Sequence, residues 1–143
     1  MTPSDLYTFI TAKPYAVLST LAANGTPQSA LVGIAATPDL EIIFDTLTTT
    51  RKYANLLANP TCSLVIGWDN EQTLQYEGTA FFPSGPDLSR YQALYFGRWP
   101  DGPARLSWPG LVHIVIRPTW LRYSDFNQQP PMIKESHFAT ASS

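Results

Sequence analysis

Short strand-like segments joined by tight turns most strongly limit the folds that this sequence can adopt. Tyr15–Leu21 is β-like, Asn24-Gly25 is a strong hairpin signal, and the chain returns from Pro27 to Ala36 as a second strand. A direct hairpin joins antiparallel neighbours, whereas parallel strands need a long crossover connection. The sequence therefore favours an antiparallel sheet over a parallel βαβ fold.

The remaining elements are bounded by proline, glycine and polar turn residues in the same way. We predict strands at 15–21, 27–36, 40–46, 61–68, 72–82 and 111–117, the last resuming at 120–123 after a break at Pro118, and helices from Thr2, Thr49 and Leu88. Gly33 suggests a close backbone approach, Gly78 a bulge, and residues 97–110 an ordered loop. These elements predict one mainly β domain over residues 1–143, a mostly antiparallel barrel with peripheral helices, with about 127–143 as a C-terminal arm or tail.

Composition and charge exclude several classes of protein. The formal net charge is −2 and the basic residues are scattered, which argues against a nucleic-acid-binding surface. No apolar run approaches the roughly 18 residues of a membrane-spanning helix, and no signal peptide is recognisable, so we expect a cytoplasmic protein. Only 14% of the residues are charged while 13% are aromatic, which suggests that a second subunit covers part of the surface.

The segment from Phe44 to Pro60 combines a strand, a hydroxyl-rich turn and a helix whose first turn carries Arg51 and Lys52. The start of a helix has partial positive charge and favours acidic side chains, so two bases there break a local rule. A bound anion would resolve the conflict, because backbone N–H groups, Thr hydroxyls, a guanidinium and an ammonium together suit a phosphate. The other reading is a solvated, charged helix face, with one of Thr48, Thr49 or Thr50 acting only as its cap.

The other reactive residue types form no recognisable catalytic or metal site. His113 lies within a predicted strand and His137 near the C-terminus, and neither has an acid or a cysteine at ligand spacing, so no metal is expected. Cys62 is the only cysteine and reads as a small buried residue. No Ser/His/Asp set, paired-carboxylate site or glycine-rich nucleotide motif is recognisable, so catalytic residues stay unknown.

The order of these elements, with Phe44-Asp45-Thr46, Thr50-Arg51-Lys52 and Asn59-Pro60, resembles the pyridoxamine 5′-phosphate oxidase-like, FMN-binding split-barrel family. Within that family the chain looks most similar to small bacterial oxidase-related or general-stress-like flavoproteins. The resemblance extends from about residue 15 to residue 126. It implies a six-stranded antiparallel split barrel, FMN as cofactor, and a homodimer with the cofactor at the subunit interface.

The resemblance also implies roles for individual residues. Arg51 and Lys52 would bind the FMN phosphate, and Thr50 belongs to the same phosphate loop. Thr46 would meet the phosphate and ribityl chain, with Asp45 beside it. The backbone of Ala30, Leu31 and Val32 would run along the edge of the flavin ring, and Thr73 would be contributed by the partner subunit. Aromatic side chains of the 97–110 loop or the C-terminal arm would line the substrate side.

The C-terminal region departs from the true oxidase. Trp120-Leu121-Arg122 is followed by residues 123–131 without the arginines that handle pyridoxal phosphate in the family, so vitamin B6 oxidation is not expected. The first hypothesis is an FMN-dependent oxidoreductase with an unknown small-molecule substrate. The second is a non-enzymatic flavin-binding, flavin-storage or stress-sensing protein. A third keeps the barrel but exchanges FMN for the deazaflavin F420 or for haem.

Overall fold

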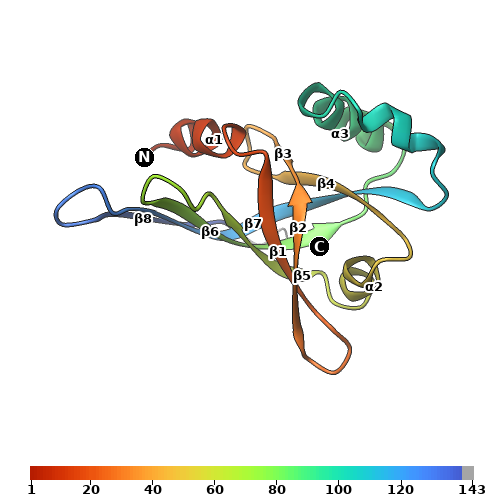
Figure 1. The fold of residues 1–143 in the computed structure, drawn as a ribbon, viewed down its shortest axis with the longest axis horizontal. Helices are drawn as coiled ribbons and strands as arrows, with labels where there is room; N and C mark the ends of the chain where they lie inside the picture. The colour runs from red at the N-terminus through yellow and green to blue at the C-terminus, as the bar shows by residue number, and fades with distance from the viewer. Residues whose placement is uncertain (140–143) are drawn as a thin grey trace.

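The structure is a computed structural model that describes residues 1–139, and these form one curved antiparallel sheet with helices around it (Figure 1). The strands are β1 (Tyr15–Leu21), β2 (Pro27–Gly33), β3 (Ala35–Ala36), β4 (Ile42–Leu47), β5 (Thr61–Ile66), β6 (Gln72–Phe81), β7 (Leu111–Asp125) and β8 (Met132–His137). The helices are α1 (Pro3–Thr11), α2 (Arg51–Ala58) and α3 (Gly85–Arg98), followed by the 3-10 helix η1 (Gly102–Ser107).

The long strand β7 changes partners along its length, and this divides the barrel. The strand order is β2-β1-β5-β6-β7-β4-β3, and β8 also pairs with β7. β6 pairs with β7 from Val115 to Asp125, whereas the other side of β7 pairs first with β4 and then, from Trp120, with β8. The two branches separate on either side of this point, as Figure 1 shows for β4 and β8. The predicted mainly β, antiparallel split barrel with peripheral helices is therefore confirmed.

The strand count differs from the predicted six, for three local reasons. Beyond Gly33 the chain leaves β1, and Ala35–Ala36 pairs with β4 instead, which makes β3 a separate strand. Pro118 does not end β7, because it lies opposite Gly78 at a register shift where Thr119 is an extra residue in the ladder. Residues 132–137 of the expected arm form β8; residues 140–143 of that arm lie outside the described residues.

The barrel interior is a continuous apolar core. Its fully buried members include Ala16, Leu18, Ile42, Phe44, Ile66, Leu74, Ile114 and Ile116. The helix α1 adds Leu6 and Ile10, and its start is fixed by a capping box between Thr2 and Asp5. Cys62, 5% exposed, packs in the same core, as its sequence context predicts.

A second, smaller cluster forms where α3 covers the outer face of the sheet. Tyr91 and Tyr95 of α3 pack on Ala35, Ile43 and Val115 of β3, β4 and β7. Just beyond α3, the Trp99 ring packs so closely on Gly33 that a Cβ there would lie 2.9 Å from it, which confirms the predicted close approach. Among residues 1–139 no helix has the length and apolar character to cross a membrane.

Candidate cofactor site

The first turn of α2 lacks the side-chain cap that usually satisfies the N–H groups at a helix start. Thr50 occupies the cap position with extended backbone, but its hydroxyl donates to the Leu47 carbonyl oxygen at 2.9 Å. The Thr46 hydroxyl lies 2.9 Å from the same Thr50 oxygen, so the two threonines link the end of β4 to the helix start. The free N–H groups of this turn therefore stay available to a ligand.

Arg51 and Lys52 place two positive charges at this helix start. The first turn of α2 contains no acidic residue, and within residues 1–139 neither cation forms an ion pair with a carboxylate. A cavity of about 350 Å³ lies between the helix start and the β1–β2 hairpin. Its lining residues are Leu18, Thr20, Gln28, Ser29, Ala30, Thr49, Thr50, Arg51 and Lys52. The local charge makes this cavity a favourable place for an anion.

The orientation of α2 depends on a buried polar contact that sequence reasoning missed. The Asn55 amide nitrogen donates to Thr20 Oγ1 at 3.0 Å and to Gln28 Oε1 at 2.9 Å, tying α2 to β1 and β2. Leu56 beside it is buried in the barrel core. Asparagine in a short helix is ordinarily a surface residue, so nothing in the sequence singles out Asn55.

The segment Ala30–Val32 lies on an edge strand. Ala30 lines the cavity, Val32 packs into the core, and Leu31 points to the opposite face with 61% of its surface exposed. Among the described strands β2 pairs with β1 alone, so alternate N–H and C=O groups along its other edge point away from the sheet. Two contacts fix the end of this strand: the Tyr95 hydroxyl donates to the Gly33 carbonyl at 3.3 Å, and Trp99 Nε1 donates to that of Ile34 at 3.0 Å.

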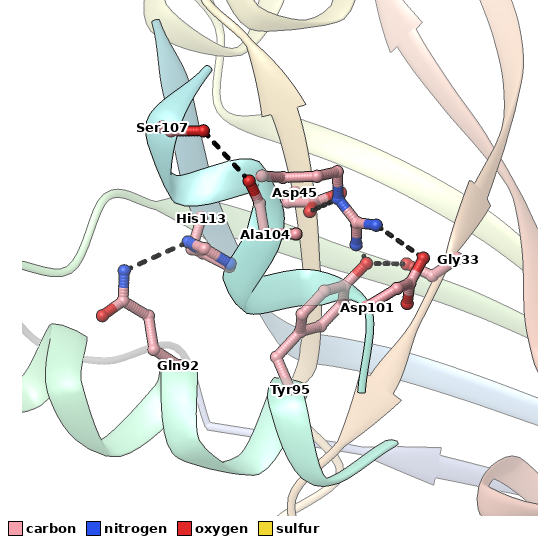
Figure 2. A network of polar contacts seen from close by, with 9 residues as sticks. Gly33, Asp45, Gln92, Tyr95, Asp101, Ala104, Ser107 and His113 are labelled. Carbon is pink, nitrogen blue, oxygen red and sulfur yellow. Dashed lines mark hydrogen bonds and ion pairs between the residues drawn. The ribbon is translucent and has the colours of Figure 1, made fainter. Parts of the chain in front are cut away.

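Asp45 faces away from the cavity, because successive side chains of β4 point to opposite faces. Figure 2 shows its carboxylate beside Tyr95 and the 3-10 helix. Arg105 Nε lies 2.8 Å from Asp45 Oδ2, and Arg105 Nη1 lies 2.8 Å from Asp101 Oδ2. The Tyr95 hydroxyl donates to Asp45 Oδ1 at 3.3 Å, and burial together with the Asp45 charge raises the pKa of Tyr95. Asp45 is thus neutralised on the far side of β4 from Arg51.

The predicted 97–110 loop is shorter in the structure, because α3 extends to Arg98, and the rest of it includes η1 and joins the turn that precedes α2. The Thr48 N–H donates to the Gly110 carbonyl at 2.9 Å. Gly110 has a φ of +78°, and a Cβ there would lie 2.5 Å from Thr48 Oγ1, so only glycine allows this approach without a shift. Leu106 and Trp108 on this loop are each about half exposed, and they lie on the segment that contacts the candidate site.

His113 and Thr73 lie outside the cavity at α2. His113 is buried under α3, with its ring centroid 5.4 Å from that of Tyr95 and its Nδ1 3.4 Å from Gln92 Nε2 (Figure 2). Burial lowers the pKa of His113, so its ring is neutral near pH 7. Thr73 is the second residue of β6 and lies opposite Ser124. The described part of the chain contains no cluster of three or more His, Cys, Asp or Glu side chains that could hold a metal ion.

Comparison with known proteins defines the class to which this fold and site belong. The family model described as pyridoxamine 5′-phosphate oxidase matches residues 3–125, and the chain therefore belongs to that family. A search of curated proteins gave no match.

Solved structures with the same fold include cofactor-binding proteins of two kinds. A haem-binding protein from Mycobacterium smegmatis aligns with a TM-score of 0.80 and 16% identity over 96% of this chain. This chain spans 58% of that protein. A pyridoxamine 5′-phosphate oxidase-related, FMN-binding protein from Nostoc punctiforme aligns with a TM-score of 0.67 and 12% identity, over 96% of this chain and 93% of that one.

A third similar structure, from Clostridium acetobutylicum, is described as related to general stress protein 26 of Bacillus subtilis. It has a TM-score of 0.71 and 14% identity, over 93% of both chains. All three identities are low, so these structures establish the shared fold and not a shared ligand.

Proposed function

We propose that this protein binds FMN, with the phosphate at the start of α2, and acts as an FMN-dependent oxidoreductase on a small-molecule substrate. The observation that carries the proposal is the uncapped start of α2, where Arg51 and Lys52 have no acidic partner among the described residues and border a cavity of about 350 Å³. In a family whose structural relatives include an FMN-binding protein, a phosphate is the ligand that best fits these groups.

The residues of the site fit a phosphate group in charge and in hydrogen bonding. The guanidinium and ammonium groups supply positive charge, and the first N–H groups of α2 supply donors. Thr46 and Thr50 meet at the base of the same turn. The nearest acid in sequence, Asp45, is paired with Arg105 on the other face of β4, so it does not oppose an anion.

The flavin ring would be oriented by backbone rather than by catalytic side chains. The free edge of β2 offers N–H and C=O groups beside Ala30, and the contacts of Tyr95 and Trp99 hold the end of that strand in place. Bound FMN supplies the redox chemistry itself. The chain would contribute binding, orientation and exclusion of water, which is consistent with the lack of a recognisable acid–base set.

A second copy of this chain would complete the site, with Thr73 reaching it from the partner. Support comes from apolar side chains on one sheet face: Leu31 of β2 and Val65 of β5 both pair with Val17 of β1 and are 61% and 40% exposed. Such a patch on a chain with few charges is typical of an interface.

We expect the Val65→Lys variant to be monomeric at concentrations where the wild-type chain is dimeric, because a buried, unpaired lysine is costly at an interface. Light scattering after size-exclusion chromatography measures this, and Leu57→Lys, exposed on α2, is the matched control. A dimeric Val65→Lys variant would show that the interface lies elsewhere.

A visible absorption spectrum of the purified protein, followed by titration of the stripped protein with FMN, tests the cofactor. We expect two flavin absorption bands and stoichiometric rebinding of FMN. A Soret band, or a spectrum of deazaflavin type, would replace FMN with haem or F420 and overturn the proposal. Reduction by NADH or NADPH and reoxidation by acceptors then separates an enzyme from a storage or sensing protein, since the latter would bind flavin without turnover.

A further inference from the structure

A second cleft, which shares no lining residue with the cavity at α2, lies between α3, the end of β6 and the middle of β7. Its volume is about 620 Å³, within the usual range for small-molecule sites. Glu41, Arg90, Tyr91, Arg117, Phe81 and Phe138 are among its lining residues. We infer that this cleft binds a small organic carboxylate, with Arg90 and Arg117 holding the carboxylate and the aromatic walls holding its apolar body.

The two guanidinium groups are held by aromatic rings, which leaves their edges open to a ligand. Arg117 stacks on the Phe81 ring at 4.0 Å from the guanidinium carbon to the ring centroid, and Arg90 stacks on Tyr91 at 4.3 Å. Stacking of this kind orients an arginine without using its N–H donors. The side chains of Arg90 and Arg117 remain 56% and 53% exposed, so both are accessible from the cleft.

Hydrogen-bond capacity in the cleft favours an anionic ligand over a cationic one. Glu41 is 9% exposed and already engaged: Thr37 donates to its Oε1 at 3.2 Å, and Tyr91 and Arg117 Nε donate to its Oε2 at 2.9 and 3.3 Å. Among residues 1–139 the terminal nitrogens of Arg117 have no hydrogen-bond partner, and the one carboxylate that reaches Arg90 is that of Asp87, at 4.0 Å. The side-chain groups of the cleft that remain available to a ligand are therefore the N–H donors of the two arginines, which suit an anion.

The charge balance of the cleft narrows the class of anion. Asp39 and Glu41 also line the cleft and reduce the positive charge that Arg90 and Arg117 give it, so these acids oppose a dianionic phosphate more strongly than a singly charged carboxylate. Phe81, Pro118 and Phe138 add an apolar wall next to the arginines. A carboxylate attached to an aromatic or aliphatic body matches both features.

The test is a titration of the ¹⁵N-labelled full chain with benzoate, with its neutral isostere benzamide and with inorganic phosphate, followed by NMR. We expect benzoate to shift the amide signals of Thr79, Ala80 and Phe81 and to saturate in the millimolar range or below. Arg90→Gln and Arg117→Gln should each weaken benzoate binding about tenfold. Arg98→Gln, at the far end of α3, is the matched control and should leave binding unchanged.

Arg90→Gln keeps the test decisive if Arg117→Gln disturbs folding, because Arg90 is 56% exposed and, unlike Arg117, donates no hydrogen bond to the buried Glu41 among the described residues. Equal shifts with benzamide, unchanged benzoate affinity in Arg90→Gln, or no shifts at the cleft would overturn the inference. Tighter binding of phosphate than of benzoate would overturn the ligand class. The amide signals of Thr79, Ala80 and Phe81 report binding in the cleft itself, so the outcome does not depend on whether the protein contains flavin.

Discussion

The Arg51→Ala/Lys52→Ala variant should fold normally and fail to retain FMN. Each charge-assisted hydrogen bond contributes about 1.5–3 kcal/mol, so loss of two should raise the dissociation constant of FMN by about two to four orders of magnitude. Quenching of FMN fluorescence on titration into the stripped protein measures this constant. A charge-matched control, Arg98→Ala/Lys134→Ala, removes two cations that do not line the cavity and should bind FMN like the wild type.

The stability of the same variant without ligand separates a binding role from a structural one. Arg51 and Lys52 lie at the positive end of the α2 dipole, where each cation is unfavourable by about 0.3–1 kcal/mol. The stripped double variant should therefore be at least as stable as the stripped wild type in urea. Full flavin content in the variant, or a marked loss of stability without ligand, would contradict the assignment of the phosphate site.

The second large effect is expected from Arg105→Met. The side chains of Arg105 and Asp45 are only 17% and 15% exposed, and their nitrogen and oxygen atoms are 2.8 Å apart. Removal of the guanidinium leaves the Asp45 carboxylate buried, and within residues 1–139 its one remaining donor is the Tyr95 hydroxyl, whose single hydrogen is shared with the Gly33 carbonyl. The free energy of unfolding should therefore fall by about 2–4 kcal/mol. Urea denaturation measures the change.

A double-mutant cycle shows whether this loss belongs to the ion pair. In Asp45→Leu/Arg105→Met the unpaired charge is gone. We therefore expect the free energy of unfolding of the double variant to be higher, by at least about 1 kcal/mol, than the sum of the two single-variant losses predicts. Arg122→Met is the matched control: its pair with Glu135 is 42% exposed on both sides and should be worth less than about 1 kcal/mol. Simple additivity of Asp45→Leu and Arg105→Met would show that the two residues act separately.

Local signals predicted most of the elements and failed where a strand depends on distant partners. The Asn24-Gly25 turn, Pro14 and Asn59-Pro60 mark boundaries that the structure reproduces to within a few residues. The sequence placed Ala35–Ala36 in one strand with β2, and β8 in an arm, because the separate identity of β3 and β8 depends on their pairing with β4 and β7. Pro118 was read as a break because the bulge opposite Gly78, which accommodates it, involves a residue forty positions away.

The features of the candidate site likewise fall into two groups, those that neighbouring residues predict and those that depend on distant contacts. The charge of Arg51 and Lys52 at a helix start is a property of neighbouring residues, so the sequence alone was enough to predict an anion site there. The sequence could not say that Asp45 turns towards Arg105, because the two residues are sixty positions apart. Nor could it show that Asn55 fixes α2 to Thr20 and Gln28. Both facts depend on which face of a strand or helix meets which neighbour.

By itself, then, the sequence determined the antiparallel elements, their turns and the cationic start of α2, because backbone preferences and helix dipoles act over a few residues. Only the tertiary structure decided that β7 exchanges β4 for β8 as its partner, that Asp45 is buried against Arg105, and that a cleft lies between α3 and β7. These features depend on contacts between segments that are far apart in the chain. Such contacts stabilise the protein only after the sheet has formed around its core.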